Sequence, residues 1–165
     1  MNCIASLCLI ASALSLPHAC LAQAAPSQFN SVKDIIGTVP KQSIAALQGG
    51  GKRAEPAATQ ANEFLKQTAV AKSASLHLRV NRVERAPGVA HAWRIEAADE
   101  TVRVAVTSFV LKLYAYLPES QTAAVAKLKK GDQVTVAGTL GRSDFTTTDK
   151  LAFHIDLNNS RVLCS

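Results

Sequence analysis

The feature that most limits the fold is an alternation of apolar and polar residues with a period of two, which starts near Ser75 and continues almost to the C-terminus. Its first clear stretch places polar residues between Leu76, Leu78 and Val80. This period is typical of strands that bury one face, because successive side chains of a strand point to opposite sides. The C-terminal part is therefore expected to be a β domain, and 18% charged residues are compatible with a globular core.

Breaks in this alternation divide it into five expected strands and one helix. The strands are expected over residues 75–85, 91–97, 102–113, 134–142 and 151–163. The phase of the alternation slips between Val80 and Val83, which predicts a β-bulge in the first strand. Asn158-Asn159 could interrupt the last strand. Residues 119–130 contain no Gly or Pro, can be capped by Ser120 and end in lysines, so they are expected to form a helix.

The order strand, strand, strand, helix, strand, strand restricts the architecture further. An open sheet of five strands would expose unpaired edges, whereas closure into a small barrel removes them. A helix between the third and fourth strands can cover one end of such a barrel. The expected fold is mainly β with helices, a five-stranded Greek-key barrel of the OB-fold type.

One stretch carries a resemblance to a known family. Residues 127–140 read KLKKGDQVTVAGTL and resemble the Gly-Asp, alternating-strand, Gly signature of many OB-fold proteins. The chain is similar there to small domains related to anticodon-binding modules, some of which are exported. Gly131-Asp132 is expected to turn the chain into a strand, and Gly138 is expected to let that strand bend. Both roles are structural, so the motif supports the fold and supplies no chemistry.

Residues 1–24 have the properties of an export signal. They contain no Lys, Arg, Asp or Glu, and the apolar stretch from Ile4 to Leu16 suits a signal-peptide core better than a membrane span. Pro17 ends that stretch, and the small residues Ala22 and Ala24 are acceptable cleavage positions. The mature protein is then expected to be periplasmic or secreted, without a stable membrane span. An uncleaved N-terminal anchor and a lipoprotein modified at Cys20 are the alternatives.

Cysteine usage follows from that interpretation. Cys3, Cys8 and Cys20 would be removed with the signal, which leaves Cys164 as the single cysteine. One cysteine cannot cross-link its own chain, so the fold must depend on its core. Cys164 is expected to be either a free thiol at the chain end or an intermolecular disulfide that would give a homodimer.

Residues 25–72 are expected to form a flexible arm with short helices ahead of the barrel domain, residues 73–165. One helical piece is expected over residues 31–47, interrupted by Gly37 and Pro40, and a second over residues 59–72. Between them, the glycines and charges of residues 49–56 predict a linker.

The charge balance favours an anionic partner. The chain has 18 Lys and Arg against 12 Asp and Glu, a formal net charge of +6. OB-folds usually bind on the outer face of their second and third strands. Side-chain alternation predicts an outward basic face that could bind phosphates, or alternatively a solvated face balanced by glutamates. The residues assigned to that face are Arg79, Arg82, Arg94, Arg103 and Thr107.

Aromatic residues are the second requirement for binding a single-stranded nucleic acid, because bases stack on them. Trp93 is expected to face inward. Phe109 is the only outward aromatic expected on the third strand, and Tyr114 and Tyr116 are expected after that strand, where they could line a groove. The cationic part of such a site is therefore clearer than the stacking part.

Catalytic and metal-binding patterns are not found. The histidines lie on separate elements without paired spacing, and the carboxylates are scattered. No nucleophile motif or phosphate-binding loop is complete, so we expect no enzyme, no cofactor and no metal site.

The sequence thus predicts an exported, non-catalytic OB-fold module that binds an anionic partner, whether nucleic acid, glycan or acidic protein. The alternative is a structural or protein-interaction component of a cell-envelope assembly. In that alternative the N-terminal helices, around Ile35–Leu47 and Phe64–Val70, would dock the partner.

Overall fold

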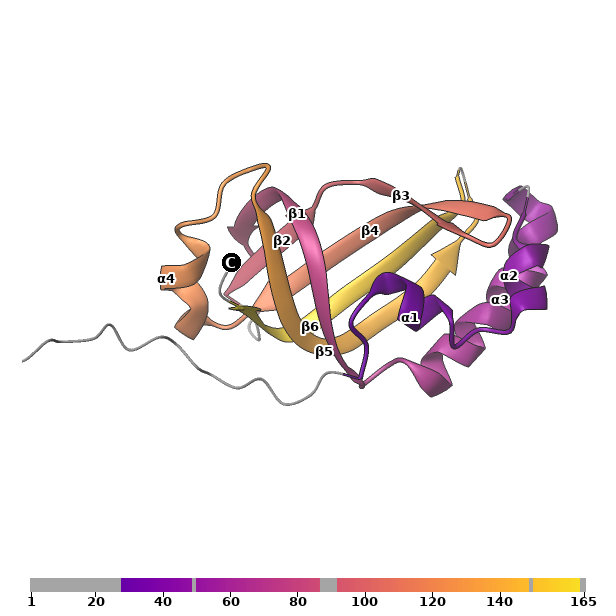
Figure 1. Ribbon diagram of the computed structural model, residues 1–165, viewed down its shortest axis with the longest axis horizontal. Helices are drawn as coiled ribbons and strands as arrows, with labels where there is room; N and C mark the ends of the chain where they lie inside the picture. Colours follow the sequence, from indigo (N-terminus) through magenta and orange to yellow (C-terminus); the bar gives the residue numbers. More distant parts are fainter. Residues whose placement is uncertain (1–27, 49, 87–91, 149, 164–165) are drawn as a thin grey trace, which may run out of the picture.

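The strands of the computed structural model close into a barrel (Figure 1). The structure describes residues 28–48, 50–86, 92–148 and 150–163; the proposed signal at residues 1–24 and Cys164 lie outside them. The strands follow the order β2-β1-β5-β6-β4-β3, and an additional β2–β4 pairing closes the ring. Their bounds are β1 Ser73–Arg85, β2 Trp93–Ala97, β3 Glu100–Val104, β4 Thr107–Leu117, β5 Gln133–Thr146 and β6 Ala152–Leu163.

Strands β2 and β3 share one position in the barrel. Trp93–Glu96 pair with the end of β4, and Glu100–Val104 pair with its beginning. The barrel therefore has five strand positions, with β4 and β6 parallel and the other pairs antiparallel. A short helical segment, η1 (Glu119–Gln121) and α4 (Thr122–Val125), connects β4 to β5. This is the OB-fold topology expected from the sequence.

The expected irregularities of the first and last strands are confirmed. The register between β1 and β2 shifts between Val80 and Arg82, where the alternation changes phase. The register between β5 and β6 shifts opposite Asn159, which has a φ of 49°. Such bulges increase the bend and twist that a small barrel needs.

The glycines of the OB-like motif have the structural roles expected of them. Gly131 has a φ of 96° in the turn before β5, and the Asp132 carboxylate accepts a hydrogen bond from the Lys129 N–H at 2.8 Å. Strand β6 passes close to Gly138, where a Cβ would lie 2.8 Å from the Asn158 carbonyl oxygen. The helical segment already ends at Val125, with Ala126 as its C-cap, so the expected helix over residues 119–130 is too long.

The expected strand over residues 102–113 is wrong. The chain reverses at Ala105-Val106, and β3 and β4 form an antiparallel hairpin in which Val104 lies opposite Thr107. Ala105 has a φ of 54°, as a tight two-residue hairpin turn requires. Opposed residues of a hairpin share a face, so Val102 and Val104 of β3 point to the same side as the buried odd-numbered residues of β4. Alternation then continues through residues 114–117, which were expected to end the strand.

The N-terminal region is helical and covers one end of the barrel, while α4 lies near the other end (Figure 1). Helix α1 (Val32–Ile36) ends at Gly37 and α2 (Lys41–Ala46) follows Pro40, as expected. The linker expected at residues 49–56 is wrong over Gly51–Pro56, which begin α3 (Gly51–Thr68). Gly50 and Gly51, with φ of 57° and 64°, turn the chain into that helix.

Burial explains why α3 forms despite Pro56. Its apolar stripe faces the barrel, with Ala54, Ala58, Ala61 and Leu65 buried. The Asn62 amide donates to the Phe145 carbonyl at 3.0 Å and accepts from the Phe145 N–H at 2.7 Å. These contacts compensate for the one helical hydrogen bond that Pro56 cannot donate. None of the helices in the described part of the chain is long and apolar enough to cross a membrane.

Candidate nucleic-acid interface

Polar side chains from five strands form a continuous outer wall on one side of the barrel. They alternate with buried residues such as Ile95, Leu113 and Ile155, so they point away from the core. Cross-strand register orders them in rows: Glu84 and Arg94 lie beside Tyr116, and Arg82 and Glu96 lie beside Tyr114. The outer wall consists of Arg82, Glu84, Arg94, Glu96, Lys112, Tyr114, Tyr116, Arg142, Asp144, His154 and Asp156.

The arginines on the β1–β2 side of the outer wall are paired with carboxylates. Arg82 contacts Glu84 at 3.2 Å and Glu96 at 3.0 Å, and Arg94 forms an ion pair with Glu84. The two arginines and two glutamates balance, so this half of the wall has little net charge. The structure therefore supports the balanced-face alternative for Arg82 and Arg94, in place of a purely basic patch.

Arg79 and Arg103 are exposed and have no ion pair with any described residue. Arg79 lies opposite Gln133, in a shallow hollow shared with His77 and Glu100. Arg103 lies on the same side of the sheet as Arg94 but at the hairpin end. The β4 partners of Arg94 and Arg103 are eight residues apart, Tyr116 and Ser108. That separation is about 26 Å along the strand, so the predicted residues do not form one compact patch.

Thr107 and Phe109 lie inside the barrel, each with 2% of its surface exposed. The Thr107 hydroxyl donates to the Ile44 carbonyl at 2.9 Å. Phe109 packs edge-on against Phe145 and Phe153, with ring centroids 5.5 and 5.9 Å away. Their assignment to the ligand-binding face is wrong, because the unrecognised hairpin reverses the phase of β4.

Tyr114 and Tyr116 lie within β4, on the outer wall, and are half-buried. The Arg94 guanidinium lies 5.3 Å from the centre of the Tyr114 ring. Burial is the largest influence on the pKa of Arg94 and lowers it, but hydrogen bonds with Glu84 and Tyr116 outweigh that effect and raise the pKa above its ordinary value. Arg94 thus stays charged between the two tyrosines, which gives the wall stacking rings beside a fixed cation.

The β5–β6 side of the wall contains residues that sequence reasoning did not select. Arg142 pairs with Asp144, and the next row places His154 beside Lys112. Burial raises the pKa of Asp156 above its ordinary value, and burial lowers the pKa of His154. The sequence signal that could have found them is the alternation of His154 and Asp156 with Phe153, Ile155 and Leu157. Their place beside the tyrosines depends on the parallel β4–β6 pairing.

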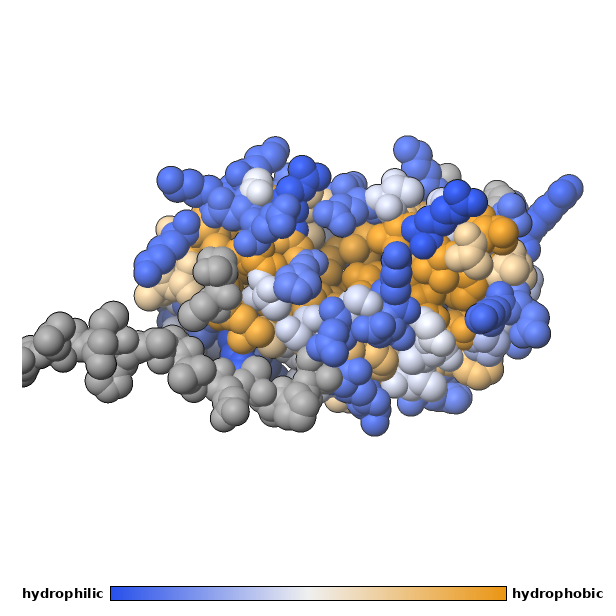
Figure 2. Space-filling view, viewed as in Figure 1, coloured by the Kyte–Doolittle hydropathy of each residue, from blue (hydrophilic) through white to orange (hydrophobic). Residues whose placement is uncertain are grey.

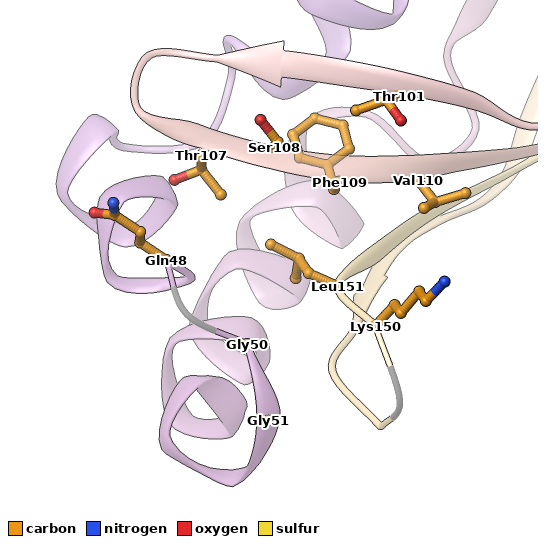
Figure 3. Close-up of a pocket in the computed structure, with 10 residues that line it drawn as sticks. All are labelled: Gln48, Gly50, Gly51, Thr101, Thr107, Ser108, Phe109, Val110, Lys150 and Leu151. Carbon is orange, nitrogen blue, oxygen red and sulfur yellow. The ribbon is translucent and has the colours of Figure 1, made fainter.

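Other surfaces fit an anionic partner less well. A hollow of about 330 Å³ lies between the α2–α3 junction, the β3–β4 hairpin and Leu151 (Figure 3). Figure 3 shows the Lys150 side chain extending away from the other lining residues. Figure 2 shows an apolar strip between polar margins, in the region where α1 and β3 flank the barrel in Figure 1. Within the described residues, no group of three or more His, Cys, Asp or Glu could hold a metal ion.

Comparisons with solved structures show likenesses to nucleic-acid-binding proteins of low sequence identity. No family model and no curated protein matches the chain. A proposed nucleic acid-binding lipoprotein from Klebsiella pneumoniae is similar, with a TM-score of 0.39 and 18% identity over 61% of this chain and 76% of that one. The SSB of Plasmodium falciparum in complex with ssDNA is similar with a TM-score of 0.31 and 19% identity, over 56% of this chain and 94% of that one.

Proposed function

We propose that this protein is a non-catalytic module that binds single-stranded nucleic acid along its outer wall. The observation that carries the proposal is the pair of tyrosines on β4, Tyr114 and Tyr116, with the Arg94 guanidinium beside them. Two outward positions of one strand are about 7 Å apart, so each ring can receive one base of an extended strand. Base stacking on aromatic rings is worth about 1–3 kcal/mol per base and tolerates any sequence.

Cations at the margins of the tyrosine pair would neutralise the phosphates. Lys112 lies on the same face of β4 as Tyr114, and Arg142 lies two strands away on β5. Both already contact carboxylates, Asp99 and Asp144, which phosphates would have to displace or share. The electrostatic contribution is therefore modest, and stacking supplies the larger part of the affinity.

The rival function, docking of an envelope partner through the N-terminal helices, has less support, because most large apolar side chains of those helices are buried or packed against the core. Ile35, Ile36, Leu47 and Leu65 are fully buried against the rest of the core. Those apolar residues stabilise the barrel end and are not available to a partner. We also propose export, on the basis of the uncharged apolar residues 1–24.

Fluorescence anisotropy with a labelled twelve-nucleotide dT oligonucleotide tests the proposal. With about three phosphate contacts, affinity should fall roughly 20-fold between 50 and 200 mM salt, since each contact to a single strand adds about 0.7 to the salt slope. Replacing both wall tyrosines (Y114A/Y116A) should abolish measurable binding. A labelled anionic glycan tested in parallel distinguishes nucleic acid from other anionic polymers.

Matched lysine variants distinguish binding at the outer wall from general attraction to a positively charged protein. Lys112→Gln removes a cation on the wall, and Lys66→Gln removes an exposed cation on α3. We expect weaker oligonucleotide binding only for Lys112→Gln. The proposal is wrong if the protein binds no oligonucleotide, if the double tyrosine variant binds normally, or if the glycan binds as tightly as dT.

A further inference from the structure

Asp156 is the acidic residue of the outer wall that is left without a partner. Glu84 and Glu96 pair with arginines, and Asp144 pairs with Arg142. Asp156 is half-buried and makes no hydrogen bond or ion pair with the described residues, although Arg142 is its register partner. Its carboxylate oxygens have no donor among the described residues and are not fully buried, so they can accept hydrogen bonds from a ligand that supplies N–H groups.

The sheet places Asp156 next to a stacking ring. Tyr114 is its direct register partner across the parallel β4–β6 pair. Because β4 lies between β2 and β6, Arg94 approaches Tyr114 from one side and Asp156 lies on the other. A base stacked on the free face of Tyr114 would therefore direct one of its edges toward the Asp156 carboxylate.

The chemistry of the bases selects one of them. A carboxylate only accepts hydrogen bonds, and it can accept two from adjacent donors. The Watson–Crick edge of guanine offers N1–H and the N2 amino group side by side. Adenine and cytosine offer one amino group beside a ring nitrogen acceptor, and thymine and uracil offer one N–H between two carbonyl oxygens. Those acceptors would repel an ionised carboxylate.

We propose that Asp156 is a specificity-determining residue that favours guanine over the other bases at one position of the bound strand. This inference rests on the proposed function, since it needs a base stacked on Tyr114. Arg142 lies opposite Asp156 in register, and Lys112 lies opposite His154 in the next row, so both cations keep the surroundings favourable for the phosphates of the same strand.

Acidic pH should weaken the preference, because a protonated carboxyl group offers a donor and loses its charge. Burial raises the pKa of Asp156, against the attraction of Arg142 and Arg94, so protonation begins at a higher pH than for an exposed aspartate. Protonation of His154 adds a positive charge near Asp156 and opposes protonation of that carboxylate. The charged and titratable groups around Asp156 are Lys112 and Tyr114 on β4, Arg142 and Asp144 on β5, His154 on β6, and Arg94 and Glu96 on β2.

The test measures the affinity of dT oligonucleotides in which one central dT is replaced by dG, dA, dC or deoxyinosine. For the native chain we expect about tenfold tighter binding with dG than with dA or dC. Deoxyinosine lacks the N2 amino group and should lose most of that advantage. Asp156→Asn should bring the dG:dA ratio close to one, while its affinity for all-dT rises because a negative charge is removed.

Glu63→Gln is the matched control, because Glu63 is an exposed carboxylate on α3, away from the outer wall. It should keep the full guanine preference, and thermal unfolding verifies that each variant is folded. Equal affinity of the native chain for dG and dA, or an undiminished preference in Asp156→Asn, overturns the inference while dT binding upholds the proposed function. Failure to bind any oligonucleotide overturns both.

Discussion

The two faces of β4 differ in chemistry and in what they do. The inward face consists of the odd-numbered residues from Thr107 to Leu117, which are buried and mostly apolar. The outward face carries Lys112, Tyr114 and Tyr116, half-buried and polar. Since the side-chain period of a strand is two, a shift of one residue would exchange these faces completely.

One two-residue turn decides which residues of β4 form the core and which can meet a ligand. Val104 and Thr107 lie opposite each other across the turn at Ala105-Val106, so both face inward. Without that turn, Phe109 would be outward and Tyr114 inward. Substitutions on the inward face should therefore change stability, and those on the outward face should change binding.

The largest expected effect is on the inward face, at Phe109. Phe109→Ala removes a ring that contacts both Phe145 and Phe153 in the core. The cavity should lower the free energy of unfolding by about 3–5 kcal/mol, measured by urea denaturation. A loss under about 1 kcal/mol would mean that Phe109 does not face the core and would reverse the assignment of the two faces.

The next effect is on the outward face, at Tyr114. Tyr114→Ala should weaken dT oligonucleotide binding about tenfold, because one stacking contact is lost. Its free energy of unfolding should change by less than about 1 kcal/mol, since the ring is only half-buried. Tyr114→Phe keeps the ring and should bind almost normally. If Phe at this position weakened binding as much as Ala, the hydroxyl and not stacking would be responsible.

Local signals made much of the fold predictable. The bulge after Val80, the Gly131-Asp132 turn and the breaks at Gly37 and Pro40 follow from backbone preferences that short segments carry. Closure into a barrel followed from the number and order of the strands. The barrel topology could therefore be predicted from these local signals and the strand order.

The β3–β4 hairpin was not predictable from the same signals. Ala105-Val106 contains no Gly, Asn or Asp, and Val106 continues the apolar alternation, so nothing in the sequence marks a turn there. The first part of helix α3, which precedes the expected helix over residues 59–72, was missed for a different reason. Its glycines and Pro56 are typical of a linker, and the burial of its alanine-rich face against the barrel outweighs that local preference.

The site was predictable only in part, because it depends on pairing between distant strands. The Arg82–Glu96 contact joins residues fourteen positions apart in the chain, and its existence depends on the register of β1 and β2. The place of Asp156 beside Tyr114 depends on a parallel pairing that no sequence pattern specified. The sequence therefore showed which residue types were present. It did not show which residues pair with one another or which hydrogen-bonding groups have no partner.

A third, smaller effect is expected at the buried end of the inward face. Thr107→Val keeps the shape of the side chain but removes the hydroxyl that donates to the Ile44 carbonyl. The variant should lose about 1 kcal/mol of unfolding free energy, because one buried hydrogen bond is lost and the Ile44 carbonyl keeps only the Leu47 N–H, at 3.2 Å. Serine at this position, which keeps the hydroxyl, should retain the hydrogen bond. Equal losses for Val and Ser would assign the effect to packing and not to the contact between β4 and α2.

The smallest effect concerns the stability contribution of Asp156, which adjoins the outward face. Its pKa in the fold lies above its ordinary value because of burial. Between these two values the folded state binds more protons than the unfolded state, so stability falls as pH rises through this window. The cost of the ionised carboxylate is fully present above the raised pKa and disappears below the ordinary value.

Asp156→Asn removes that ionisation and therefore its cost. At pH 7 its Tm should exceed that of the native chain by about 1–2 °C, in line with surface substitutions. The difference should shrink as pH falls, because the native carboxyl group becomes neutral as well. Differential scanning calorimetry from pH 7.5 to pH 4 follows this convergence. A gain in Tm that persists unchanged at pH 4 would show that Asn stabilises the fold through a new contact. The ionised carboxylate of Asp156 would then carry no desolvation cost that hydrogen bonds from a base could offset.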